Sequence, residues 1–482
     1  MIKLKNQNLL RQECLINGEW VKAQDSVLEI VNPFDNSKIG TVPKLDKATL
    51  NLAVEKAQEA FKTWSKLMPL ERSAVLMRWH QLILDNIDDL ALIMTSEQGK
   101  PLAEAKGEIL NGVSYLPWFS EQARRACGEV IPSPWPNKRP ISYHQPVGVV
   151  AAITPWNFPS SLLMRKLAPA LAAGCTVIAK PAKETPFSAL ALGYLAVEAG
   201  IPKGVLNIVT GDSRVVGDVF TTHPLIRKVT FTGSTAVGKT LLAQCAGTVK
   251  RTSMELGGNA PYIVFADADL ERAASYAIAC KFRNAGQTCI SANRIFVEKS
   301  VVAEFTKKFV EKVKTLKLGN GVDPQTTCGP LIHEQAVKDI ETLLKKALEQ
   351  GAKLVIGGKR SELGGTFFEP TVLSNVTPEN ILFQEEIFGP IAPIYTFETE
   401  EEVIKLANAV PVGLAAYVFT QNLRRSWLIA EALEFGLVGV NEVALTTPEA
   451  PFGGMKESGM GKEGSTGGLE DYQVTKYALM GL

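Results

Sequence analysis

Residues 228–240 read "KVTFTGSTAVGKT", and this run decides the fold class. Lys228 to Thr232 is typical of a strand, Gly233 of a tight turn, and the residues from Ala236 of a helix. Similar units precede it from Gly148 onward, with the apolar strands "GVVAAIT", "CTVIAK" and "VLNIVTG" each followed by a helical pattern. The alternation predicts an α/β fold in which helices cover both faces of a parallel sheet.

The same run matches the P-loop pattern Gly-x-x-x-x-Gly-Lys-Thr, from Gly233 to Thr240. A later apolar run ends in Asp267, as a magnesium-binding strand would. However, a P-loop usually follows the first strand of its domain, whereas this one follows several strand–helix units. A nucleoside triphosphatase and a turn without a ligand stay open as alternatives. We favour phosphate binding by a different cofactor, because the amides and dipole of a helix N-terminus suit any phosphate.

The rest of the chain predicts further elements. Apolar spacing of three and four over residues 47–65 and 71–98 predicts two helices. New strand–helix units begin near Glu255 and predict a second α/β domain. Five prolines in residues 130–146 predict an edge ribbon or a crossing between domains. The final "YQVTKYALMGL" predicts a strand that needs a partner edge, which we place in another subunit.

Composition excludes several classes of protein. The chain has 482 residues, 46% of them apolar, and a net charge of +1, which fits a globular protein of two or three domains. A nucleic-acid or membrane-surface role would need a strong basic excess. Neither a secretory signal nor a membrane span is recognisable. Seven scattered cysteines without a Cys-x-x-Cys pair, and four isolated histidines, predict no disulfide framework, no metal site and a cytoplasmic location.

Several motifs occur in a fixed order: "ITPWNFP" (153–159), "FTGSTAVG" (231–238), "MELGGNAP" (254–261), "FRNAGQTC" (282–289) and "EEIFGP" (385–390). Together they resemble the aldehyde dehydrogenase superfamily along essentially the whole chain, and most closely its bacterial succinate-semialdehyde type. The resemblance implies a Rossmann-like cofactor domain, an α/β catalytic domain and a small β-ribbon that joins subunits into dimers or tetramers. The expected boundaries are 1–124 with 147–254 for the cofactor domain, 255–445 for the catalytic domain, and 125–146 with 465–482 for the ribbon.

The resemblance assigns three catalytic residues whose chemistry fits. Cys289 matches the nucleophile, because a thiolate forms the covalent adduct from which an aldehyde carbon can give up hydride. We expect nearby donors or a helix N-terminus to favour that thiolate. The side-chain amide of Asn157 matches the donor that stabilises the oxyanion. Glu255 matches the general base for thioester hydrolysis, and its apolar neighbours would raise its pKa.

The resemblance also implies a dinucleotide cofactor bound by residues in four of these motifs and in "KPAKETP" (180–186). Lys183 stands where NAD-specific relatives often carry a glutamate, and an ammonium attracts a 2′-phosphate. We therefore expect a preference for NADP, with NAD possible, and a solvent-facing Lys239. The expected cofactor-binding residues are Trp156, Asn157, Lys180, Ala182, Lys183, Gly233, Ser234, Leu256, Glu386 and Phe388.

For the substrate, the resemblance implies a small semialdehyde whose carboxylate is bound by Arg165, Arg283 and a hydroxyl in the loop 441–451, there Thr447 with Thr446 beside it. Such an enzyme would take part in GABA degradation. Glutarate semialdehyde or another aldehyde stays open, because one methylene is worth only about 1–3 kcal/mol in discrimination. A non-catalytic relative such as a lens crystallin is disfavoured, because Cys289, Glu255 and Asn157 are all present.

Overall fold

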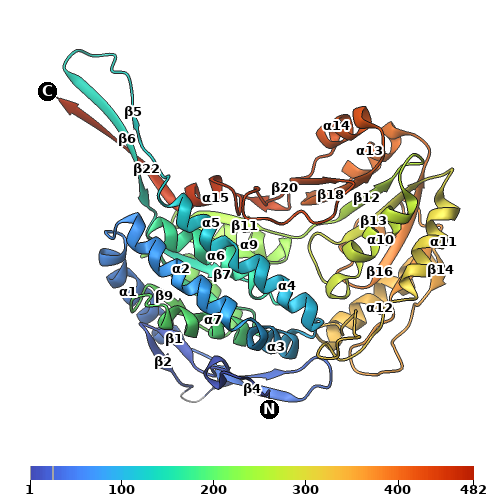
Figure 1. Cartoon of the computed structure of the whole chain (residues 1–482), viewed down its shortest axis with the longest axis horizontal. Coiled ribbons are helices and arrows are strands. Elements are labelled where there is room, and N and C mark those ends of the chain that lie inside the picture. Colours follow the sequence, from blue (N-terminus) through green and yellow to red (C-terminus); the bar gives the residue numbers. More distant parts are fainter. Residues whose placement is uncertain (1, 24–25, 482) are drawn as a thin grey trace.

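The computed structural model describes residues 2–23 and 26–481. Two large sheets with their helices lie side by side, and a narrow three-stranded arm projects from the first of them (Figure 1). No helix in the described residues has the length and apolar character needed to cross a membrane.

The first sheet is confirmed as the predicted α/β element, but it is mixed. Its central strands β9, β8, β7, β10 and β11 are parallel, whereas β1, β2 and β21 add antiparallel edges that we did not predict. The strands are β1 (Cys14–Ile16), β2 (Glu19–Val21), β7 (Val149–Ile153), β8 (Thr176–Lys180), β9 (Leu206–Ile208), β10 (Ile226–Thr232), β11 (Arg251–Glu255) and β21 (Gly459–Met460).

Helices cover both faces of this sheet, as the continuous apolar strands predicted. In β7, Val150 and Ala152 join a core built with α2–α7, while Val149, Ala151 and Ile153 join a second core with α1, α8 and α9. The helices are α1 (Lys47–Trp64), α2 (Pro69–Asp85), α3 (Ile87–Gln98), α4 (Leu102–Val113), α5 (Tyr115–Gln122), α6 (Ser161–Ala173), α7 (Pro186–Glu198), α8 (Ser213–Thr222) and α9 (Thr235–Ala246).

The prediction of one helix over 71–98 is wrong. Asn86 leaves the helical region at φ −109° and ψ 15°, so that it ends α2 and begins α3. Its side-chain amide donates to the carbonyl of Leu82 at 2.8 Å and satisfies an end of α2. The apolar periodicity continues through the break because both helices pack on the same core, and periodicity alone therefore hides it.

The second sheet confirms the predicted second α/β unit. All its neighbouring strands are parallel except β14 and β15. Its strands are β14 (Lys353–Ile356), β15 (Thr371–Ser374), β16 (Ile391–Phe397), β13 (Ala292–Glu298), β12 (Ala260–Val264), β18 (Ala415–Phe419) and β19 (Leu437–Val440). Its helices are α10 (Leu270–Lys281), α11 (Val302–Val313), α12 (Glu334–Glu349), α13 (Glu400–Asn408) and α14 (Leu423–Ala432).

The arm consists of β5 (Glu129–Val130), β6 (Lys138–Pro146) and β22 (Gln473–Gly481). β22 pairs with β6 from Gln473↔Pro146 to Gly481↔Lys138, so the final strand finds one partner edge in its own chain. This pairing gives the ribbon that the resemblance implied, and it corrects the expectation that the strand depends on another subunit for a partner. In the described residues the other edge of β22 carries no strand.

Shorter elements complete the fold. The glycine-rich stretch 452–468 contains two short strands and the start of a short helix. These minor elements are β3 (Val27–Val31), β4 (Lys38–Pro43), β17 (Val412–Gly413), β20 (Met455–Lys456) and α15 (Gly467–Glu470), with 3-10 turns at Gln7–Leu9, Arg283–Gly286 and Ile381–Phe383. β21 pairs with β11, which brings this stretch against the carboxyl end of the first sheet.

Candidate active site

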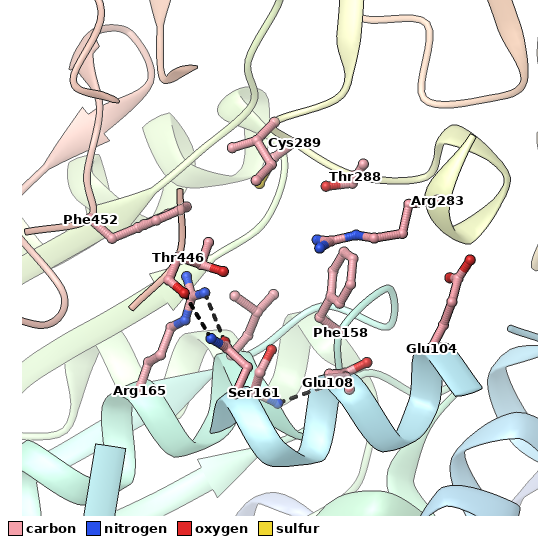
Figure 2. Close-up of a pocket in the computed structure, with 14 residues that line it drawn as sticks. Glu104, Glu108, Phe158, Ser161, Arg165, Arg283, Thr288, Cys289, Thr446 and Phe452 are labelled. Carbon is pink, nitrogen blue, oxygen red and sulfur yellow. Dashed lines mark hydrogen bonds between the residues drawn. The ribbon is translucent and has the colours of Figure 1, made fainter. Parts of the chain in front are cut away.

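A cavity of about 280 Å³ lies between α4, α6 and the loop that follows α10 (Figure 2). Cys289 lines it from above, and Arg165 and Arg283 enter it from different sides. The lining residues are Glu104, Gly107, Glu108, Asn111, Phe158, Ser161, Leu162, Arg165, Arg283, Thr288, Cys289, Ile290, Thr446 and Phe452.

A turn with left-handed backbone conformation, at residues 284–286, precedes Cys289 and positions it at the cavity. Asn284, Ala285 and Gly286 have φ values of 51°, 55° and 77°, a region that non-glycine residues rarely adopt. A Cβ on Gly286 would lie 2.2 Å from the carbonyl oxygen of Gly389, so only glycine fits there. The Asn284 amide donates to the backbone oxygen of Asn157 at 3.0 Å, which fixes the nucleophile's loop against the segment of the proposed oxyanion donor.

The Cys289 thiol is half-buried, and burial raises its pKa to about 12, with the Glu386 carboxylate adding to the rise and Arg165 opposing it. The expectation that neighbouring donors hold a thiolate is therefore wrong for the protein alone. The proton has to leave as the sulfur attacks, so a base must lie within reach.

Asn157 is buried, and its amide donates to the Gln287 carbonyl at 3.0 Å. A primary amide carries two N–H groups, so one donor remains for an oxyanion. The Asn157 backbone oxygen also accepts a hydrogen bond from the Lys100 ammonium at 2.7 Å. Lys100 is itself paired with the buried Glu108, so a buried ion pair supports the position of Asn157.

Glu255 ends β11, is buried, and has one carboxylate oxygen without a partner among the described residues. Burial raises its pKa well above the usual range, the charge of Glu463 adds to the rise, and Lys166 and Arg165 oppose it. A carboxyl group with a raised pKa suits general base catalysis near neutral pH. Lys166 binds Glu463 at 2.6 Å, a pair 297 residues apart that sequence reasoning missed.

The predicted cofactor residues gather at the carboxyl ends of the first sheet. Ser234 is the N-cap of α9, and the Gly233 amide donates to the Glu255 carbonyl at 3.0 Å. Trp156 and Phe388 meet edge to face, with ring centroids 5.6 Å apart. The turn that would hold a pyrophosphate is thus bonded directly to the residue predicted as the base.

Two charged groups here have little to bind in the protein itself. The buried Lys180 ammonium has only the Pro181 carbonyl, at 3.3 Å, as a hydrogen-bond acceptor among the described residues. Glu386 accepts a hydrogen bond from the Gly258 amide at 3.0 Å, and burial raises its pKa to about 7. A Cβ on Gly257 would lie 2.6 Å from the Glu386 carboxylate. Such groups fit the hydroxyls of a dinucleotide's riboses.

The remaining expected cofactor residues are Ala182, Lys183 and Leu256, which follow Lys180 and Glu255 closely in the sequence. Ala182 and Leu256 are buried, and the Leu256 amide donates to the Ser458 carbonyl at 2.9 Å. The Lys183 side chain is 66% exposed, 3.8 Å from Glu184, and free to reach a ligand.

The P-loop interpretation is wrong, because Gly238 and Lys239 make contacts within the protein that do not involve a phosphate site. A Cβ on Gly238 would lie 2.4 Å from the Leu256 side chain, so this glycine allows close packing of α9. Lys239 faces solvent as predicted and pairs with Glu457 at 2.8 Å.

On the substrate side, Arg165 is buried but poorly satisfied. Its closest polar contacts are Asn111 Oδ1 at 3.4 Å and Glu463 at 3.9 Å, and its Nε has no partner among the described residues. The exposed Arg283 lies 4.9 Å from the Phe158 ring. Both arginines predicted to bind a carboxylate thus meet in the cavity with Cys289.

The predicted hydroxyl contact falls on a different threonine. Thr446 lines the cavity, whereas Thr447 is exposed and donates to Glu449 outside it. Which of two neighbouring side chains points inward depends on the backbone of the loop, and the sequence carries no signal for that.

Comparisons with known proteins agree with this geometry. The sequence pattern of the aldehyde dehydrogenase family matches residues 20–478. The chain is 50% identical to 3-sulfolactaldehyde dehydrogenase of Pseudomonas putida, over 100% of this chain and 99% of the relative. It is 49% identical to the NADP(+) succinate-semialdehyde dehydrogenase GabD of Escherichia coli K12, over 100% of both chains. The crystal structure of succinate-semialdehyde dehydrogenase from Burkholderia pseudomallei, 50% identical, superposes with a TM-score of 0.98 over 100% of both chains. The chain therefore belongs to the aldehyde dehydrogenase family and is an NAD(P)-dependent oxidoreductase.

Proposed function

We propose that the enzyme oxidises short aldehydes that carry a carboxylate, with succinate semialdehyde as the first candidate and glutarate semialdehyde as the alternative. One observation carries this proposal: the Arg165 guanidinium is buried, lines the same cavity as Cys289, and has no hydrogen-bond partner for its Nε among the described residues. A buried cation is stable only with a partner, and a carboxylate matches a guanidinium with two parallel hydrogen bonds. Arg283, which lines the same cavity, supplies a second positive charge.

The arrangement supports a two-stage reaction on Cys289. The sulfur bonds to the aldehyde carbon as its proton passes to solvent water, and the resulting oxyanion accepts a hydrogen bond from the Asn157 amide. A bound nicotinamide cofactor would supply the two-electron oxidant, as the acceptor of the hydride that leaves this carbon. The carbon is then a thioester.

Glu255 removes a proton from water, which attacks the thioester, and the carbon–sulfur bond breaks to release the acid. Because the base form of Glu255 is needed here, its raised pKa sets the pH range in which this second stage runs.

NADP is the preferred cofactor in this proposal, and NAD is possible. The exposed Lys183 ammonium would lie near the ribose held by Lys180, where it attracts a 2′-phosphate. Ser234 and Gly233 would hold the pyrophosphate, and Glu386, Trp156 and Phe388 the nicotinamide half.

We further propose the predicted division of the chain: a cofactor domain of 1–124 and 147–254, a catalytic domain of 255–445, and a ribbon of 125–146 and 465–482. The ribbon would join subunits into a dimer or tetramer. Its strand β22 supports this, because it exposes Tyr477, Leu479 and Met480 and offers an open backbone edge. A cytoplasmic location and a role in GABA degradation belong to the same proposal.

The test is oxidation of matched pairs of aldehydes by the purified enzyme with NADP and with NAD, measured by reduced-cofactor absorbance. Succinate and glutarate semialdehydes are compared with butanal and pentanal, which lack the carboxylate. The expected result is a much larger kcat/KM for the carboxylated member of each pair, and no turnover by Cys289→Ala. Equal values within each pair would refute the proposed substrate class, and a Cys289→Ala enzyme that still turned over would refute the mechanism.

A further inference from the structure

A second cavity of about 550 Å³ lies next to the active-site cavity and shares two of its walls. Its lining residues are Asn111, Ser114, Pro117, Trp118, Glu121, Thr446, Thr447, Pro448 and Glu449. Only Asn111 and Thr446 line both cavities. Among the described residues, these two therefore lie where the two spaces meet, and we call them the partition.

One side-chain amide joins the partition to the substrate site. Asn111 donates from Nδ2 to the backbone oxygen of Thr446 at 3.1 Å, and its Oδ1 accepts from Arg165 Nη2 at 3.4 Å. Both bonds are dashed in Figure 2, where Thr446 lies directly beside Arg165. The same amide thus links α4 to the loop after β19 and orients the guanidinium that faces Cys289.

The two cavities differ in charge. The inner one is lined by the guanidinium groups of Arg165 and Arg283 and by the carboxylates of Glu104 and Glu108, of which Glu108 is paired with Lys100. The outer one is lined by the carboxylates of Glu121 and Glu449 and, among the described residues, by no Lys or Arg side chain. The outer cavity also has apolar walls at Pro117 and at Trp118, whose indole is fixed by a 3.1 Å hydrogen bond to the Ser465 carbonyl. The inner cavity therefore favours a substrate's carboxylate, and the outer cavity favours an uncharged substrate chain.

We propose that Asn111 is a specificity-determining residue. By closing the partition with Thr446 and holding Arg165, it restricts the site to short aldehydes with a terminal carboxylate and excludes long uncharged ones. The part of this inference that concerns Arg165 rests on the proposed function. The part that concerns the length of the substrate depends only on the partition.

The experiment compares Asn111→Ala with Ser114→Ala, using succinate semialdehyde, butanal and octanal. Asn111 is half-buried, so its truncation is compatible with folding, and equal thermal midpoints would verify that. Ser114 lies on the same stretch and lines only the outer cavity, which makes Ser114→Ala the matched control.

For Asn111→Ala, kcat/KM is expected to fall about tenfold for succinate semialdehyde, the usual effect of losing a hydrogen bond to a charged group. For octanal it is expected to rise about tenfold or more, because even one methylene that gains space is worth about tenfold. The kcat/KM for butanal should stay nearly unchanged, because butanal is too short to reach the outer cavity. In Ser114→Ala, kcat/KM for all three substrates should be the same as in the wild type.

Unchanged octanal turnover in a folded Asn111→Ala enzyme would overturn the partition. An equal gain in Ser114→Ala would overturn the assignment to Asn111. If the wild type does not discriminate between succinate semialdehyde and butanal, the proposed function fails, yet the octanal gain can still appear. The two failures are therefore distinguishable.

Discussion

Replacing Arg165 by methionine tests the carboxylate site most directly. Methionine preserves much of the side-chain volume between Tyr115 and Phe452, whose rings lie 5.5 and 4.4 Å from the guanidinium. It removes the buried cation of the cavity, so the substrate carboxylate would be left in a low-dielectric space without that partner.

The expected loss follows from this burial. Removing one partner of a buried charge pair costs about 3–5 kcal/mol, and roughly 1.36 kcal/mol corresponds to a factor of ten. The kcat/KM for succinate semialdehyde should therefore fall by about two to three and a half orders of magnitude. Arg283→Met, at an exposed position, should cost less than about fivefold, because exposed ion pairs contribute about 0.2–1 kcal/mol.

Steady-state kinetics with succinate semialdehyde and butanal separate charge recognition from general damage to the site. Butanal has no carboxylate, so in Arg165→Met its kcat/KM should fall much less than that of succinate semialdehyde, and only through the lost charge that lowers the pKa of Cys289 and Glu255. If the ratio of the two substrates does not change in Arg165→Met, or if Arg283→Met changes it more, the assignment of Arg165 as the principal anchor is wrong.

Three further predictions concern the cofactor, the base and the turn. Lys183→Glu reverses one exposed charge and should lower the NADP to NAD ratio of kcat/KM by about tenfold or more. Each unit of charge changed contributes roughly 1 kcal/mol to the interaction with the 2′-phosphate. An unchanged ratio would exclude Lys183 from 2′-phosphate binding. Glu255 has a raised pKa, so it is protonated and inactive as a base below that pKa, and thioester hydrolysis should speed up as the pH rises through it. Glu255→Gln should abolish that pH dependence and leave a burst of one reduced cofactor per active site in stopped-flow absorbance. Gly286→Ala places a Cβ 2.2 Å from a carbonyl oxygen, whereas Gly351→Ala, at φ 93°, meets nothing within 4 Å. Gly286→Ala alone should therefore lower the free energy of unfolding, measured by denaturant titration, by more than the ~1 kcal/mol expected for a left-handed alanine.

Sequence patterns predicted the elements whose signal is local. The strand–turn–helix run at 228–240 and the apolar strands before it specify a covered parallel sheet, because residues of β7 and β8 alternate between two cores. The break at Asn86 was missed, since apolar periodicity continues across it. The antiparallel edges β1 and β21 were missed because they join the sheet through contacts far apart in the sequence.

The candidate site was predictable where a motif carries the chemistry, as at Cys289, Asn157 and Glu255. It was not predictable where distant side chains supply the environment. The Lys166–Glu463 pair joins residues 297 positions apart, and neither has a distinctive neighbourhood in the sequence. The protonation state of Cys289 was expected wrongly for a similar reason, because burial by several segments outweighs the nearby arginines.

The neighbours Arg165 and Lys166 on α6 are two cations whose charges both act on the Glu255 carboxyl group. Burial raises the pKa of Glu255, and the charges of Lys166 and Arg165 oppose that rise. A carboxylate bound to Arg165 would cancel part of this opposition, so substrate binding and proton uptake by Glu255 become thermodynamically linked. By reciprocity, affinity for an anionic aldehyde should strengthen as the solution is acidified through the pKa of Glu255, while affinity for an uncharged aldehyde should stay level. Through these two residues of α6, the pH optimum of the enzyme would depend on the charge of the aldehyde substrate.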